Sequence, residues 1–394
     1  MKPRDIEKLK QRAGEAIERQ GEALRQAALY LHDHPEVGWH ETQAASRLTD
    51  FLAERGFAVE RGVAGFSTAF RAVRRSSRPG PTIAFLAEYD ALEGVGHGCG
   101  HHLIAGGALG AALGAAEALG ELAGAVMVFG TPAEEFTNQL QGKIQLLRAD
   151  AFAGIDACLM FHPWIFSAPI NSSLAFTAID VTFHGRTAHA AADPWNGLNA
   201  LDAVIMTFNG INALRQHIRP DVRIHGIITD GGVAPNIIPE RAAARFMMRA
   251  RKFDEVRRIL ERVRACAEGA ALASGTKLEL QVTCETADTV ALPALQRLTR
   301  ANFEALGLPF GPPADWTAST DFGDVSYRIP SESFFMSLGA GSLPWHSAEV
   351  VKAGAEEPAL RAMLNAAKVL AMDGIDLLAQ PEVLQEARRE LPQA

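Results

Sequence analysis

The chain has 394 residues, with 46 acidic and 38 basic side chains, which gives a formal charge of −8. Its 48% hydrophobic and 21% charged residues exclude a disordered protein, and its acidic balance argues against a nucleic-acid partner. It has no apolar run of about 20 residues, no secretory leader and no CxxC pair, which predicts a reduced cytoplasmic protein without a membrane span.

The first part of the chain predicts an α/β domain. Residues 4–31 and 42–55 carry apolar positions at helical spacing, and the second of these helices ends at Gly56. Short apolar runs at 82–88, 125–129, 157–161 and 333–338 are typical of strands buried on both faces. A helix-length stretch rich in Ala and Leu, 103–122, lies between the first two runs. The order of strand, helix and strand predicts a mostly parallel sheet.

The middle of the chain follows another pattern. Residues 175–184, 223–228 and 242–248 alternate between polar and apolar side chains, while 198–216 and 253–273 have one apolar helical face. Alternation indicates half-exposed strands in an antiparallel sheet, here covered by two helices. We therefore expect a smaller α+β domain at 172–287, inserted into a larger α/β domain made of 1–171 and 288–394. The length also favours two domains, because a typical domain has about 150 residues.

Side chains that can bind metal ions follow the carboxyl ends of all four predicted buried strands. In chain order they are Asp90, Cys99, His101, Glu134, Glu135, His162 and His346. Ligands of open α/β sheets bind at this edge, and thiolate, imidazole and carboxylate groups suit zinc or a related divalent ion. The alternative is that each group is structural, but so many groups at one edge favour a site.

The loop HGCGHH, residues 97–102, precedes the Ala-rich helix. If the loop is extended, His97, Cys99 and His101 point the same way, because side chains alternate along an extended chain. The alternative is a buried cysteine in a helix-capping loop with incidental histidines. The roles of His97 and His102 stay open.

Glu134 and Glu135 follow the apolar strand at 125–129 after the short stretch GTPA. Two adjacent carboxylates cannot both face one atom, so we expect them to have different tasks. One can bind a metal ion while the other accepts a proton from water. The alternative is a solvated pair in a loop.

The inserted domain has its own polar cluster, formed by His189, Asn236 and Arg249. These side chains could bind a substrate carbonyl oxygen and a carboxylate. Turn chemistry explains the Asn equally well, and Arg249 could pair with a surface acid.

Taken in order, the motifs of the chain resemble a known family. They are LHDHPEVGWHE, AEYDALEGVGHGCGHH, GTPAEE, MFHP, FHGRTAHAAADPWNGLNALDA, GGVAPNIIPERA, STDFGDVSY and PWHS. Together they resemble metallopeptidase family twenty, the co-catalytic enzymes that include carboxypeptidase G, aminoacylase and dipeptidases. The branch that they resemble most holds the p-aminobenzoyl-glutamate hydrolases and the indole-acetyl-amino-acid hydrolases.

The resemblance implies two divalent metal ions, zinc or manganese. The ligands that it implies are Cys99, His101, Glu135, His162 and His346. Glu134 would be the general base and later proton donor, with Asp90 supporting the metal site. His189 matches a histidine that reaches the active site of the neighbouring subunit in related dimers. Asn236 and Arg249 match substrate-binding positions, and the inserted domain implies a homodimer.

The leading hypothesis is a metal-dependent amidohydrolase. It would cleave an N-acyl or N-aroyl amino acid or a dipeptide with metal-bound hydroxide, assisted by Glu134. The same site could instead deaminate an aryl amine. Cys99 could be a nucleophile with His101 or His97 as its base, or the protein could bind peptides without catalysis. The 20 Phe and five Trp residues are scattered and predict no aromatic pocket.

Overall fold

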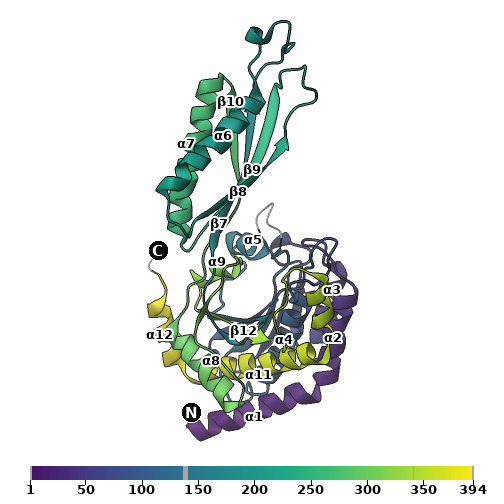
Figure 1. The fold of residues 1–394 in the computed structure, drawn as a ribbon. Helices are drawn as coiled ribbons and strands as arrows, with labels where there is room; N and C mark the ends of the chain where they lie inside the picture. The colour runs from purple at the N-terminus through teal and green to yellow at the C-terminus, as the bar shows by residue number, and fades with distance from the viewer. Residues whose placement is uncertain (1, 136–140, 340, 393–394) are drawn as a thin grey trace.

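The computed structural model describes residues 2–135, 141–339 and 341–392. An eight-stranded sheet with helices on both faces forms a body, and a four-stranded antiparallel sheet with two helices forms a lobe that projects from it (Figure 1). This arrangement confirms the predicted α/β fold with a separate inserted unit. Among the described residues, no helix has the length and apolar character that crossing a membrane requires.

The sheet of the body brings the predicted strands side by side. Across the sheet the strands are β1 (Ala58–Arg61), β2 (Phe70–Arg75), β4 (Ala125–Gly130), β3 (Thr82–Ala87), β5 (Ala157–Trp164), β12 (Ser331–Ser337), β6 (Ala168–Ser172) and β11 (Ala314–Asp315). The four central strands β4, β3, β5 and β12 are parallel, whereas β1, β2 and β6 pair antiparallel with their neighbours β2, β4 and β12. The carboxyl ends of the central strands therefore share one edge.

Helices cover both faces of this sheet. They are α1 (Pro3–Arg19), α2 (Gly21–Asp33), α3 (Thr42–Ala53), α4 (His101–Ala116), α5 (Gly142–Arg148), α8 (Pro293–Ala305), α9 (Phe322–Ser326), α10 (Ala348–Gly354), α11 (Glu357–Ala379) and α12 (Pro381–Glu390). The single helix predicted over 4–31 is wrong. It breaks at Gln20, which has non-helical angles, and the break lets α1 and α2 both pack on α4.

Helix α4 is buried along its whole length, between the sheet on one side and α11 with α1 and α2 on the other. Its glycines permit this close packing. A Cβ atom at Gly107 would lie 2.3 Å from the ring of Phe161, and one at Gly106 would lie 2.3 Å from the sulfur of Met363. The N-terminus of α4 is thereby fixed at the carboxyl edge of the sheet, where His101 begins the helix.

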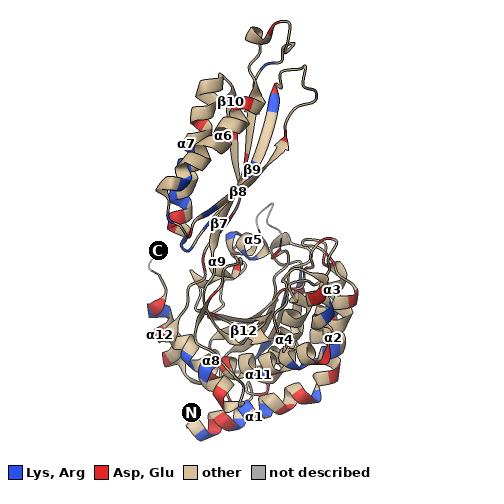
Figure 2. Ribbon diagram, in the orientation of Figure 1, with Lys and Arg blue, Asp and Glu red and all other residues tan. Residues whose placement is uncertain are grey.

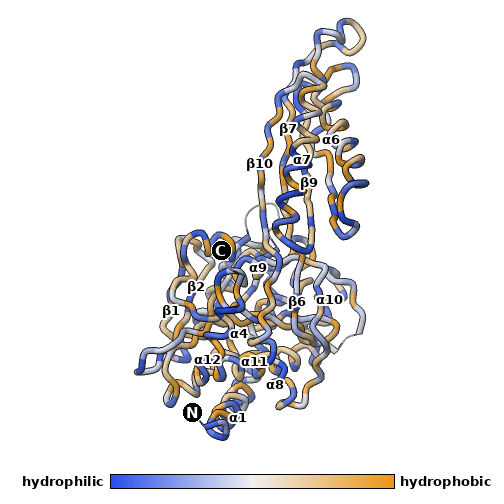
Figure 3. Tube along the Cα trace, turned by 90° about the vertical axis from the view of Figure 1, so that its left-hand side faces the viewer, coloured by the Kyte–Doolittle hydropathy of each residue, from blue (hydrophilic) through white to orange (hydrophobic). Residues whose placement is uncertain are grey.

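The lobe has the predicted antiparallel sheet with two covering helices. Its elements are β7 (Ala175–His184), β8 (Arg223–Asp230), β9 (Arg241–Ala250), β10 (Lys277–Thr286), α6 (Ala200–Leu214) and α7 (Phe253–Ser274), with the strand order β10-β7-β9-β8. The turned view in Figure 3 shows the lobe standing above the body. The sequence did not predict β10, and the boundaries at 172 and 287 stay a prediction.

Two chain segments join the lobe to the body. The hydroxyl groups of Ser173 and Thr289, one on each segment, lie 2.8 Å apart, so the segments are linked where they meet.

Charged residues are frequent on the outer helices α1 and α7, whereas the strands around β12 carry few of them (Figure 2). Short turns of 3-10 helix complete the described structure at η1 (Val63–Gly65), η2 (Pro194–Asn196) and η3 (Arg215–His217).

Candidate metal centre and active site

Five side chains expected as metal ligands meet at the carboxyl edge of the sheet. One atom each of Cys99, His101 and His162 lie within 4.8 Å of one another, and so do atoms of Cys99, Glu135 and His346. The sulfur of Cys99 is 3.5 Å from Nε2 of His162. Cys99 belongs to both groups.

Asp90 orients the ligands on both sides. Its Oδ1 lies 3.0 Å from Nδ1 of His101, so that Nε2 of this ring points into the cluster. Its Oδ2 accepts a hydrogen bond of 2.9 Å from the backbone N–H of Glu135. Burial opposes the protonation of His101, but the Asp90 carboxylate raises the pKa of His101 well above its usual range. A metal ion at Nε2 would replace that proton.

The backbone explains why Glu134 and Glu135 face different neighbours. Ala133 before them is buried with a left-handed φ of 59°, a conformation that an alanine adopts only where surrounding contacts hold it. One such contact is the hydrogen bond of 2.8 Å from the N–H of Ala133 to Oε1 of the buried Glu41. Glu135 then lies with Oε1 3.4 Å from Nε2 of His346.

Glu134 is buried beside the ligands. Burial raises the pKa of Glu134 well above its usual range, and the carboxylates of Glu88 and Glu135 raise it further. Burial also acts on Glu135, but the hydrogen bond with His346 and the charge of His101 leave the pKa of Glu135 lowered. The pKa values of the two adjacent acids are thus shifted in opposite directions.

The donor atoms fit divalent metal ions. Nε2 of His101 is buried and has no hydrogen-bond partner among the described residues. One thiol, three imidazoles and one carboxylate form a set suited to Zn²⁺, and the harder donors among them also suit Mn²⁺. Burial raises the pKa of the Cys99 thiol well above its usual range, which disfavours a free thiolate nucleophile.

His97 and His102 turn away from this cluster. Nε2 of His97 lies 3.0 Å from the carbonyl oxygen of Leu31, and Nε2 of His102 lies 3.0 Å from that of Gly354. The condition under which His97 would point the same way as Cys99 is not met, because the loop is not extended. Its Gly96 and Gly100 have left-handed φ angles of 95° and 79°.

A cavity of about 270 Å³ opens beside the cluster. Its lining includes the expected ligands Cys99, Glu135 and His346, the acid Glu134, and the indoles Trp164, Trp316 and Trp345. The ring centroid of Trp164 lies 4.3 Å from that of Trp345 and 5.8 Å from that of Trp316. The scattered tryptophans of the sequence did not mark this aromatic lining, because three of the five converge only in the folded chain.

Arg249 reaches the same cavity from the lobe. It is on β9 opposite Phe176, at the end of the lobe sheet that is nearest to the body. Its guanidinium lies 5.6 Å from the centroid of the Phe176 ring and donates a hydrogen bond of 3.3 Å to Ser319. A cation with spare donors in this position can bind a substrate carboxylate.

The structure does not bring His189 and Asn236 to the cluster within one chain. Both are exposed in loops at the far end of the lobe, where His189 pairs with Ile237. The eight residue steps of β7 from Phe176 to His184 span about 26 Å. Nδ1 of His189 accepts hydrogen bonds from the backbone N–H groups of Ala191 and Ala192, so the proton of the neutral ring is on Nε2 and points outward.

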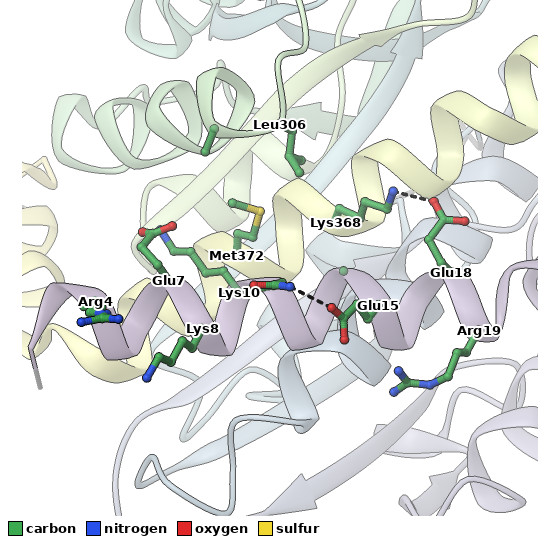
Figure 4. A pocket seen from close by; sticks show the side chains of 13 residues that line it. Arg4, Glu7, Lys8, Lys10, Glu15, Glu18, Arg19, Leu306, Lys368 and Met372 are labelled. Carbon is green, nitrogen blue, oxygen red and sulfur yellow. Dashed lines mark hydrogen bonds and ion pairs between the residues drawn. The ribbon is translucent and has the colours of Figure 1, made fainter.

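A larger hollow lies elsewhere and is lined by none of these residues. It has a volume of about 850 Å³ and runs along α1, where mostly charged side chains line it (Figure 4).

Sequence reasoning missed four buried charged residues next to the site: Glu41, Glu88, Lys143 and Asp321. The rule that functional groups follow strand ends could have found Glu88, which comes directly after β3. No such signal marks the others, because their place depends on how separate elements pack.

Comparison with known proteins identifies the family. The model of the peptidase dimerisation domain matches residues 175–274. The chain is 35% identical to the mouse Xaa-Arg dipeptidase, in an alignment that covers 98% of this chain and 93% of that protein. The chain belongs to the M20 peptidase family.

Two further M20 relatives agree with this assignment. One of the subunits of the p-aminobenzoyl-glutamate hydrolase of Escherichia coli is 30% identical, with 95% of this chain and 93% of that protein covered. A Bacillus subtilis structure, described as a dinuclear metal binding peptidase of the M20 family, has the same fold with a TM-score of 0.70, at 19% identity over 92% of this chain and 99% of that chain. This M20 protein is therefore an enzyme, a hydrolase of the peptidase and amidohydrolase type.

Proposed function

We propose that this M20 protein is a metal-dependent hydrolase that cleaves the amide bond of a dipeptide or of an N-acyl or N-aroyl amino acid. The observation that carries the proposal is the pair of donor groups that share Cys99, with the buried acid Glu134 directly beside them. The relatives support the substrate class, because they are named as an Xaa-Arg dipeptidase and a p-aminobenzoyl-glutamate hydrolase.

Two ions, zinc or manganese, would be held by Cys99, His101, Glu135, His162 and His346. When bound, such ions polarise a substrate carbonyl and lower the pKa of water. Asp90 keeps His101 and Glu135 in place through its two hydrogen bonds. The sulfur donor favours zinc, and the harder donors suit manganese.

Glu134 moves the proton in this proposal. Its buried carboxylate, which has an oxygen within 4.8 Å of donor atoms of His101 and Glu135, would accept a proton from the attacking water and keep it until the amine leaves. It then donates the proton to the leaving nitrogen, so the carboxylate is restored for the next cycle. A group that remained a strong acid in this place would give up its proton to solvent instead.

The lobe would complete the active site from a second copy of the chain. His189 carries its proton on Nε2 at an exposed tip, so it can donate a hydrogen bond to the carbonyl oxygen as negative charge develops there. The exposed Ile227 and Ile228 on the edge strand β8 offer an apolar surface for a homodimer. Asn236 lies at the same tip and would hold a polar group of the substrate.

The cavity supports a substrate with one flat and one acidic end. The three indoles present aromatic faces to an acyl group or side chain, and Arg249 supplies a positive charge for the carboxylate of the amino acid. The indole N–H of the buried Trp316 has no partner among the described residues, so an acceptor on the substrate would satisfy it.

Amine release from a panel of dipeptides and acyl amino acids, measured with chelated and metal-reconstituted protein, tests the proposal. Glu134→Gln should lower kcat by a factor of about 10² to 10⁴ and leave the metal content unchanged. A chelated protein that keeps its activity, or a variant that loses its metal, would contradict the roles assigned here.

A further inference from the structure

Lys143 is a buried cation next to the site. It lies on α5 and has no exposed side-chain surface. Its Nζ donates hydrogen bonds of 2.7 Å to Oε1 of Glu88 and 2.6 Å to Oδ1 of Asp321. The backbone N–H of Lys143 donates a third, of 2.8 Å, to Oδ2 of Asp321. The ammonium is thus fixed between two carboxylates from opposite sides.

These two carboxylates extend to the metal centre. Oxygen atoms of Glu88, Asp321 and Glu134 lie within 4.8 Å of one another, and all three residues are buried. The second oxygen of Glu88, Oε2, is 3.5 Å from Nε2 of His101 and has no hydrogen-bond partner among the described residues. Glu88 therefore joins Lys143 on one side to a predicted metal ligand on the other.

Three acids this close need a positive charge. Burial without a partner costs several kcal/mol for each charge, and removing one member of a buried ion pair leaves the other uncompensated. Lys143 is the cation that contacts both Glu88 and Asp321 within the described part of the chain. Without it, Glu88 and Asp321 would repel each other, take up protons or move apart.

We propose that Lys143 is a positioning residue of the active site, whose ammonium clamps Glu88 and Asp321 and so holds Glu88 against His101 and beside Glu134. The clamp joins the end of β3, helix α5 and the residue before α9 around the metal ligands. Partners of this kind set the orientation of ligands and the affinity for the metal. The inference rests on the metal site proposed above.

Lys143→Met tests the clamp, because it keeps the apolar stem and removes the charge. Chelated protein is titrated with Co²⁺ alone, and the band that arises from the Cys99 thiolate reports the geometry of the site. We expect the dissociation constant for the ion to rise by a factor of about 10 to 100 and the band to shift. In the zinc-loaded protein, kcat should fall by a similar factor while KM stays within about threefold of the native value.

Lys10→Met is the matched control. Lys10 is also buried and pairs with Asp376 at 2.8 Å and Asn302 at 2.9 Å, but it lies on α1, at the end of the body opposite the lobe (Figures 1 and 4). We expect both variants to lower the melting temperature of the metal-free protein. Only Lys143→Met should weaken Co²⁺ binding. Equal weakening in both variants would show that general stability, rather than the clamp, sets the affinity.

Glu88→Gln covers the case in which Lys143→Met does not fold. It keeps an acceptor for Lys143 and removes the charge that faces His101. We expect weaker Co²⁺ binding at a nearly native melting temperature, and native affinity would overturn the proposal. If the native protein itself binds no divalent ion, the proposed function fails. If it binds the ion and the variants bind it equally well, only the role of Lys143 fails.

Discussion

Paired subunits that carry different inactivating changes can show which chain supplies His189. Within one chain, His189 is separated from the cavity by the length of β7, about 26 Å, so the proposed contact with the substrate must come from a partner. Loss of a hydrogen-bond donor to a developing oxyanion lowers kcat by about 10² to 10³, and loss of the proton carrier Glu134 lowers it by about 10² to 10⁴. Each single variant alone should therefore be nearly inactive.

The assay uses two differently tagged copies that are produced together and purified through both tags. In a dimer of one Glu134→Gln chain and one His189→Ala chain, one site combines an altered acid with an altered histidine and is inactive. The other combines the native body of the His189→Ala chain with the native lobe of its partner. We expect about half of the native activity per dimer, because one of two sites in a symmetric dimer is intact.

The control places both changes in the same chain and pairs it with a native chain. One site then has the native acid but receives the altered histidine, and the other has the altered acid, so we expect almost no activity. If His189 acted on its own subunit, the results would be reversed: the control would keep about half of the native activity and the mixed dimer almost none. That reversal, or a native enzyme that is active as a monomer, would refute the contact across the dimer.

Three other changes have expected outcomes. Arg249→Met should raise KM for a dipeptide by a factor of about 10 to 100, because a hydrogen bond to a charged group contributes about 1.5 to 3 kcal/mol. The KM for the same dipeptide with a C-terminal amide should change little. Equal KM changes for both substrates would contradict carboxylate binding. Trp164→Ala should raise KM for an N-aroyl amino acid up to about tenfold, since an aromatic pair adds about 0.5 to 1.5 kcal/mol. The KM for the corresponding N-acetyl amino acid should rise less. A larger rise for the N-acetyl compound would contradict binding of the aroyl group by Trp164. Burial raises the pKa of Asp373 to about 7; the nearby Asp376 carboxylate also raises it, and the charge of Lys10 lowers it. The stability that protonated Asp373 contributes is therefore present at low pH and is lost as the pH rises through about 7. Relative to the native protein, Asp373→Asn should therefore gain about 3 kcal/mol in unfolding free energy between pH 5 and pH 8 in denaturant titrations, and a constant difference would exclude this titration.

The parts of the site that could be predicted from the sequence are those tied to the ends of strands. An apolar strand is visible in one sequence, and its carboxyl end is a fixed point in a parallel sheet. Cys99 and Glu135 follow such ends and His162 lies in the last residues of β5, near its carboxyl end, so their convergence depends on the order of strands β4, β3 and β5. The role of His97 stayed open in the sequence, because two glycines with left-handed φ angles turn its loop and no periodic pattern reveals that conformation.

The tryptophans of the cavity are a part of the site that could not be predicted from the sequence. Trp164 ends β5, but Trp316 and Trp345 lie in loops whose positions depend on the packing of the whole body. In the sequence, more than 150 residues separate Trp164 from Trp316, and nearly 30 separate Trp316 from Trp345, so no local pattern joins the three. The same holds for Lys143 and Asp321, which meet because α5 and α9 pack against each other on one face of the sheet.

Residues at strand ends and residues that line the cavity are under different structural constraints in an M20 enzyme. Metal ligands must keep their strand-end positions, because the ions fix the distances between them. The indoles and Arg249 face a cavity and can change without moving a ligand, so substrate preference is free to vary on a constant metal centre. Lys143 belongs with the first group in this respect: it does not line the cavity, yet a change there would disturb Glu88, whose Oε2 lies 3.5 Å from Nε2 of the proposed ligand His101.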